Sequence, residues 1–217
     1  SPPGLSNMNA YMRTHHPHHR LAGTHDDPDL PNYQDYPVTR SRLKRKLMRD
    51  ITGRTGIRTI KFISSRIRRL RELDAENRNC TLRGVVANLL MFGVLFAFGE
   101  GWLYLMWPAA IIFVQPLVSR IRQVAEHAAV PDLYDPDARM NTRTVYSNFL
   151  SRMLVCPHQV NYHLEHHLLP SVPKYNLALM HRLLQNKGYY KGVYFPKGYV
   201  ELLIHVTLED DEHLAAA

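Results

Sequence analysis

The sequence has little cysteine and little acidic charge. Its 217 residues include two cysteines, Cys80 and Cys156, which lie far apart and form no CxxC pair. This spacing excludes a disulfide framework and a cysteine-based zinc site, and it favours a reducing compartment. The chain has 19 acidic residues against 27 Lys and Arg, so its net charge is +8. That balance favours an anionic partner, such as a membrane surface, an acidic protein or a nucleic acid.

The chain also lacks a signal peptide, an initiator Met and an internal repeat of solenoid length. It opens at Ser1 in a stretch that contains Pro and Gly. We therefore expect it to begin inside a longer protein.

Charge is missing from two adjacent runs in the middle of the chain, Gly84–Gly99 and Gly101–Val118, which only Glu100 separates. Each run is slightly shorter than the roughly 20 residues that span a bilayer, but flanking residues can extend both. Trp102 and Trp107 suit a membrane interface. The pattern predicts a transmembrane hairpin over about 84–118 with its turn at Glu100. The alternative is a buried helical hairpin of a soluble protein.

Basic residues flank this hairpin on both sides: Arg78, Arg83, Arg120 and Arg122. Because basic flanks stay on the cytoplasmic side, we expect both ends of the hairpin there, with everything attached to them.

The remaining pattern is helical and contains no convincing strand. We expect residues 1–39 to be irregular, because they hold many Pro and Gly breakers. Residues 40–78 predict two basic helices, with a break near Gly53 and Gly56, that suit an anionic bilayer surface. Further helices are expected over 142–156, after Pro157, and over 174–187.

Thirteen histidines are present, and two segments share the pattern H-x-x-H-H. The pattern places three imidazoles on one face of a helix. Two triplets supply six imidazoles, more than a tetrahedral zinc uses, so they favour a dinuclear site. Spacing alone leaves iron, zinc, copper and nickel open. The two triplets are His15, His18 and His19, and His163, His166 and His167.

Two features qualify this interpretation. Pro17 lies inside the first triplet and predicts that the triplet stands at the start of a helix. The isolated histidines are interpreted as structural residues: His16, His25, His158, His181, His205 and His213.

The segment NYHLEHHLLPSVP resembles the last histidine box of the membrane fatty acid desaturase family, and HHPHHR followed by HDDPDLPNY resembles its middle box. The phrases RQVAEH and TRTVYSNFLSRMLVCPHQVNYHLEHH are similar to the rhizobitoxine-type bacterial branch. The resemblance covers roughly residues 1–190. It implies that His127 is a further metal ligand and that Gln123 holds a metal-bound water.

The family's first box, H-x-x-x-H, and its first pair of spanning helices have no separate counterpart in the sequence. We therefore expect residues 1–208 to be the C-terminal part of a desaturase domain, followed by a flexible tail over 209–217. We also expect this fragment to be inactive alone.

The resemblance implies an all-α, integral-membrane, multi-pass helical bundle with a cytoplasmic helical cap that carries the metal site. It implies O₂-dependent desaturation of a fatty acyl chain at two iron ions. Electrons would come from a ferredoxin or a cytochrome b5-like protein. Acidic side chains that could orient the ligands are Asp26, Asp27, Asp29, Glu126 and Glu165.

Three other functions are alternatives to a desaturase. A lipid, alkane or carotenoid hydroxylase on the same scaffold would begin with the same hydrogen abstraction. A zinc-dependent membrane hydrolase would need neither O₂ nor reductant. A basic nucleic-acid-binding protein is disfavoured, because the chain has an uncharged hairpin and no DNA-binding motif.

Overall fold

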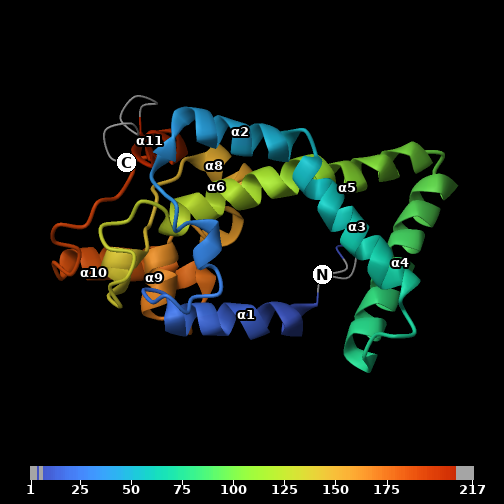
Figure 1. Ribbon diagram of the computed structural model, residues 1–217, viewed down its shortest axis with the longest axis horizontal. Coiled ribbons are helices and arrows are strands. Elements are labelled where there is room, and N and C mark those ends of the chain that lie inside the picture. Colours follow the sequence, from blue (N-terminus) through green and yellow to red (C-terminus); the bar gives the residue numbers. More distant parts are fainter. Residues whose placement is uncertain (1–3, 5–6, 209–217) are drawn as a thin grey trace. The chain divides into compact units, whose positions relative to one another are not determined.

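The computed structural model describes residue 4 and residues 7–208 (Figure 1), so the tail expected over 209–217 lies outside the described residues. The described chain is mostly helical, which confirms the predicted all-α class. The helical bundle and the cytoplasmic cap stay predictions. It divides into two compact units. The first, which we call the hairpin unit, contains the described residues up to His15 together with Leu47–Leu117. The second, which we call the histidine unit, contains His16–Lys46 together with the described residues from Val118.

The chain passes between these units within three helices: α1 (Met8–Leu21), α2 (Arg40–Ile51) and α6 (Gln115–His127). The other elements of the hairpin unit are α3 (Arg54–Arg68), α4 (Ala75–Ala97), the 3₁₀ helix η2 (Gly101–Leu105), α5 (Met106–Ala109) and the π-helical turn η3 (Ala110–Val114).

The expected hairpin is present, and the chain turns between α4 and α5 (Figure 1). Asp74 caps α4, because its carboxylate accepts the backbone N–H of Asn77 at 2.9 Å. Gly99, with φ +79°, lies in the turn, where the left-handed conformation favours glycine. Both Ala75–Ala97 and Gly101–His127 are long and apolar enough to cross a membrane. Few of their apolar residues are buried within the protein, which argues against the core hairpin of a soluble protein.

A glycine permits close packing between α3 and η3. A Cβ atom on Gly56 would lie 2.2 Å from the carbonyl oxygen of Ile112, so only glycine allows this approach. The expected helix break is therefore correct at Gly53, where φ is +78°, but wrong at Gly56, which lies inside α3. The second basic helix ends at Arg68 rather than near residue 78, and α4 begins at Ala75.

The histidine unit contains short helices joined by loops. A two-residue parallel pair joins β1 (Val38–Thr39) to β2 (Thr207–Leu208), with Val38 opposite Thr207. The core of the histidine unit is apolar and includes Val38, Val124, Leu164 and Leu202. The remaining elements are η1 (Leu30–Asn32), α7 (Ala138–Asn141), α8 (Phe149–Leu154), η4 (Pro157–Gln159), α9 (His163–Leu168), η5 (Lys174–Asn176), α10 (Leu177–Asn186) and α11 (Tyr199–His205).

Two local predictions are wrong. Residues 1–39 are not irregular throughout, because α1 continues through Pro17, and the first histidine triplet lies in its second half rather than at its start. The ring of a proline costs one backbone hydrogen bond but does not forbid a helix whose side chains are packed. The helix expected over 142–156 is confined to α8, because Thr144 pairs with Tyr162 in an isolated antiparallel bridge.

Candidate metal centre

Four histidines of the histidine unit converge on one point. One ring nitrogen from each lies within 4.8 Å of the others. His18 comes from α1, His127 from the end of α6, and His163 and His167 from α9, where they are one helical turn apart. His18, His127 and His163 are buried, and His167 is half-buried. Three separate stretches of chain thus bring four imidazoles together.

The hydrogen bonds of these rings show which nitrogens face inward. The Nδ1 of His127 lies 3.0 Å from the backbone carbonyl oxygen of Asn141, so this nitrogen must donate and the Nε2 must carry the lone pair. That Nε2 lies 2.9 Å from the Nε2 of His163. The Nε2 of His167 is buried and has no hydrogen-bond partner among the described residues. Buried polar atoms usually have partners, so a cation at this point would satisfy nitrogens that the protein leaves facing one another.

A second group lies beside the first. The rings of His19 and His166 are 4.5 Å apart between centroids, and the ring of His19 is 4.3 Å from that of His167. His15 is the last residue of the hairpin unit and precedes His19 by one turn of α1. This spacing places both on one face of the helix, and the participation of His15 in the second group stays a prediction.

Burial keeps the three candidate ligand rings of α9 neutral. Desolvation is the largest cause that lowers the pKa of His163 and His167 well below the ordinary histidine value, and repulsion by neighbouring imidazoles adds to it. The pKa of His166 is lowered by the same desolvation and then by His18. A neutral imidazole has the lone pair that binds a metal, so the site favours cation binding over protonation.

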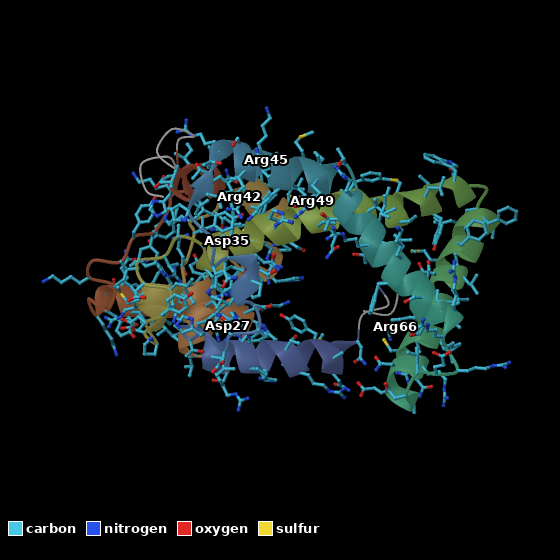
Figure 2. All side chains as sticks on the ribbon, in the orientation of Figure 1. Asp27, Asp35, Arg42, Arg45, Arg49 and Arg66 are labelled. Carbon is cyan, nitrogen blue, oxygen red and sulfur yellow. The ribbon has the colours of Figure 1, made fainter. Side chains whose placement is uncertain are left out.

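A buried carboxylate orients His18. Asp27 follows α1, and Figure 2 labels it. Its Oδ1 accepts the Nδ1–H of His18 at 2.8 Å and the backbone N–H of Asp29 at 2.8 Å, while its Oδ2 accepts the hydroxyl of Tyr33. Burial opposes ionisation of Asp27, but these hydrogen bonds outweigh it and lower the pKa of this carboxyl. With its Nδ1–H held by Asp27, His18 presents its Nε2 as the ligand atom.

Tyr33 is a site residue that sequence reasoning missed. Its ring stacks on His127, with centroids 4.8 Å apart and 21° between the planes, while its hydroxyl reaches Asp27. The phenol therefore connects the partner of one ligand to the face of another. The only signal in the sequence was its place in the segment HDDPDLPNY that follows the first triplet.

The other acidic candidates behave differently. Asp26 is exposed, and Asp29 approaches His18 only at 3.9 Å. The Oε1 of Glu126 accepts a hydrogen bond from the Nη2 of Arg122 at 3.2 Å and lies 4.0 Å from the Nδ1 of His163.

Glu165 does not orient a ligand ring, although it stands within the second triplet. It is fully buried and accepts hydrogen bonds from Thr144 at 2.5 Å, His181 at 2.6 Å and Tyr190 at 2.5 Å. Its side chain thus joins α9 to α10 and to the loop that follows α10. His181, interpreted as an isolated structural histidine, is the partner that fixes this acid.

Gln123 lies one turn before His127 on α6 and is half-buried. Its role as the holder of a metal-bound water stays a prediction.

Comparison with known proteins adds one finding. The family model described as fatty acid desaturase matches residues 2–199, which include both histidine triplets and His127. No curated protein and no solved structure matches the chain significantly.

Proposed function

Because the chain belongs to the fatty acid desaturase family, whose members are membrane-associated oxidoreductases of acyl chains, we propose that it desaturates a fatty acyl chain with O₂ at a paired iron centre. The resemblance noted in the sequence is thereby confirmed for the family, and the rhizobitoxine-type branch stays a prediction. One observation carries the proposal: four imidazoles from three stretches of chain converge within 4.8 Å, beside the His19–His166 pair.

The donor set fits iron. Imidazole nitrogens suit iron as they suit zinc, copper and nickel, so the choice of iron rests on the family. With iron bound, O₂ and electrons from an external donor would provide the oxidant that removes hydrogen from an unactivated methylene. In the proposed ligand shell one ion is held by His18, His127, His163 and His167, and the other by His15, His19 and His166.

The protein's part is ligation, orientation and exclusion of water. Asp27, which accepts the hydroxyl of Tyr33, holds His18 in one tautomer, and the carbonyl of Asn141 does the same for His127. Gln123 is proposed to hold a water near the metals. The buried surroundings of His163 and Glu165 keep bulk solvent from the site.

We place the protein in a membrane as a multi-pass chain with its metal site on the cytoplasmic side. The two apolar helices and the basic residues at both ends of the hairpin support this orientation. Arg42, Arg45 and Arg49, at helical spacing along α2, add positive charge (Figure 2). This helix suits anionic lipid, and secondarily an acidic electron donor such as a ferredoxin or a cytochrome b5-like protein.

The test is product analysis in cells that express the complete protein. We expect a fatty acid with a new double bond, and loss of that product in His127→Ala but not in His25→Ala, which removes an exposed histidine of the same unit. A new alcohol in place of a double bond would assign the protein to the related hydroxylases. Acyl hydrolysis that needs neither O₂ nor reductant would refute the proposal.

A further inference from the structure

The short helix α8 has an apolar surface that nothing in the described chain covers. Four of its six residues are large apolar side chains with high exposure: Phe149 78%, Leu150 61%, Met153 60% and Leu154 60%. Scattered apolar residues are normal on a protein surface, but a contiguous exposed group marks a surface that binds something.

This surface is held rigidly from behind. Asn148 caps α8 by accepting the backbone N–H of Ser151 at 2.8 Å. Cys156, which is fully buried, follows the helix and donates its thiol hydrogen to the carbonyl of Ser151 at 3.3 Å. Arg152 is exposed and donates to the hydroxyl of Ser147 at 3.3 Å. The helix is therefore anchored on one side, and its apolar side chains are presented on the other.

The exposure of α8 resembles that of the candidate membrane spans. Leu89 and Leu90, in the apolar part of α4, are each 64% exposed, which is what a lipid-facing side chain shows when only the protein is considered. The side chains of α8 have the same exposure, although they belong to the histidine unit. Contact with lipid would explain the high exposure of both the α4 and the α8 side chains.

The charge around α8 fits a bilayer surface. No Asp or Glu occurs between Asp137 and Glu165, while Arg152 is exposed on α8 itself. Helix α8 contacts η4, which in turn contacts η5, where Lys174 and Tyr175 are exposed. Apolar side chains with basic and aromatic neighbours are typical of segments that lie in the headgroup region of a membrane.

We propose that α8 is a membrane-docking element: Phe149, Leu150, Met153 and Leu154 insert into the interfacial layer of the bilayer that holds the hairpin, and Arg152 meets lipid phosphates. This inference rests on the proposed membrane location and needs neither the metal nor the reaction. Because the hairpin tethers the histidine unit to the same bilayer, a small apolar surface suffices for docking.

The test places a fluorophore on single cysteines in a Cys80→Ser, Cys156→Ser background, with the protein in phosphatidylcholine–phosphatidylglycerol vesicles. Serine retains a donor for the bond of Cys156 to Ser151. Labels at Leu150→Cys and Met153→Cys should be quenched by lipids that carry a shallow doxyl group and should be several-fold less sensitive to aqueous iodide than a label at the exposed Asn186→Cys.

A label at Leu90→Cys, on the apolar stretch of α4, reports membrane insertion itself. If it is quenched by lipid while the α8 labels remain as open to iodide as Asn186→Cys, the docking inference fails alone. Protection of the α8 labels from both quenchers would show a protein partner or a second copy, and would also overturn it. Absence of lipid quenching at Leu90→Cys would refute the membrane location instead.

Discussion

At the scale of single residues, the converging histidines differ from the side chains that orient them. Asp27 does not belong to the converging histidines, yet it receives hydrogen bonds from His18, Tyr33 and the backbone of Asp29. Its neighbour Asp26 is exposed and has no comparable role. The two adjacent acids therefore provide a matched pair for testing whether orientation of a ligand matters.

Asp27→Asn should weaken metal binding. The amide offers one acceptor atom where the carboxylate offers two, so either the tautomer of His18 or the bond to Tyr33 is lost. Loss of such a partner typically lowers metal affinity about 10- to 100-fold. Competition with a chelator, followed by metal analysis, measures the change. Asp26→Asn should behave as the unaltered protein, and equal losses in both variants would contradict the assigned role.

Acidic pH should lower the stability of the metal-free protein. The pKa values of His163 and His167 are lowered in the folded state, so at acidic pH the unfolded chain binds protons that the folded chain does not. Stability then falls as pH drops below the unfolded histidine pKa of about 6.5, by on the order of 1 kcal/mol per pH unit for each group.

Thermal unfolding of the chelated protein in detergent between pH 8 and pH 5 measures this effect. We expect a lower Tm at acidic pH and a weaker dependence in a His163→Phe, His167→Phe variant. A Tm that rises toward pH 5 would show that the two imidazoles are not held neutral.

At the scale of elements, close helix packing governs the hairpin unit. Gly56 of α3 approaches the backbone of Ile112 so closely that any side chain would clash, whereas nothing lies within 4 Å of a Cβ placed on Gly93 of α4. Gly56→Ala should therefore destabilise the protein by about 1–3 kcal/mol, the usual cost of overpacking.

Gly93→Ala is the control, because alanine favours a helix and meets open space there. Unfolding in detergent, read as the shift in Tm, compares the two. If both variants unfold at the temperature of the unaltered protein, the contact between α3 and η3 is looser than described.

Element prediction from the sequence succeeded where periodicity and composition dominate. The uncharged runs predicted the hairpin and its turn, and the helix expected over 174–187 is present as α10, which ends before Gly188 with φ +71°. It failed where tertiary contacts override local preference. Helix α1 continues through Pro17 and brings His18 into the buried histidine group, and pairing of Thr144 with Tyr162 prevents a helix over most of 142–156.

The candidate site shows the same division. Spacing alone identified both triplets, and the resemblance to a family identified His127, which then joined His18, His163 and His167. No local pattern could show that Glu165 turns toward His181 or that Tyr33 stacks on His127, since these contacts join segments distant in the sequence.

At the scale of the whole molecule, the chain combines a hairpin that exposes apolar side chains with a histidine unit whose buried polar groups converge. The apolar helices expose their side chains in the manner of membrane spans, and the four converging imidazoles lie in the histidine unit. The combination of an apolar hairpin with a histidine site matches a family of membrane-associated oxidoreductases that act on lipid acyl chains.

The most direct test of the central claim is metal stoichiometry and Mössbauer spectroscopy on the complete protein purified from ⁵⁷Fe-grown cells. We expect two iron ions per chain with the signature of a coupled pair, and loss of that signature in His167→Ala but not in His25→Ala. A protein that holds zinc alone, or that retains its iron pair in His167→Ala, would contradict the claim that these imidazoles form one paired-metal centre.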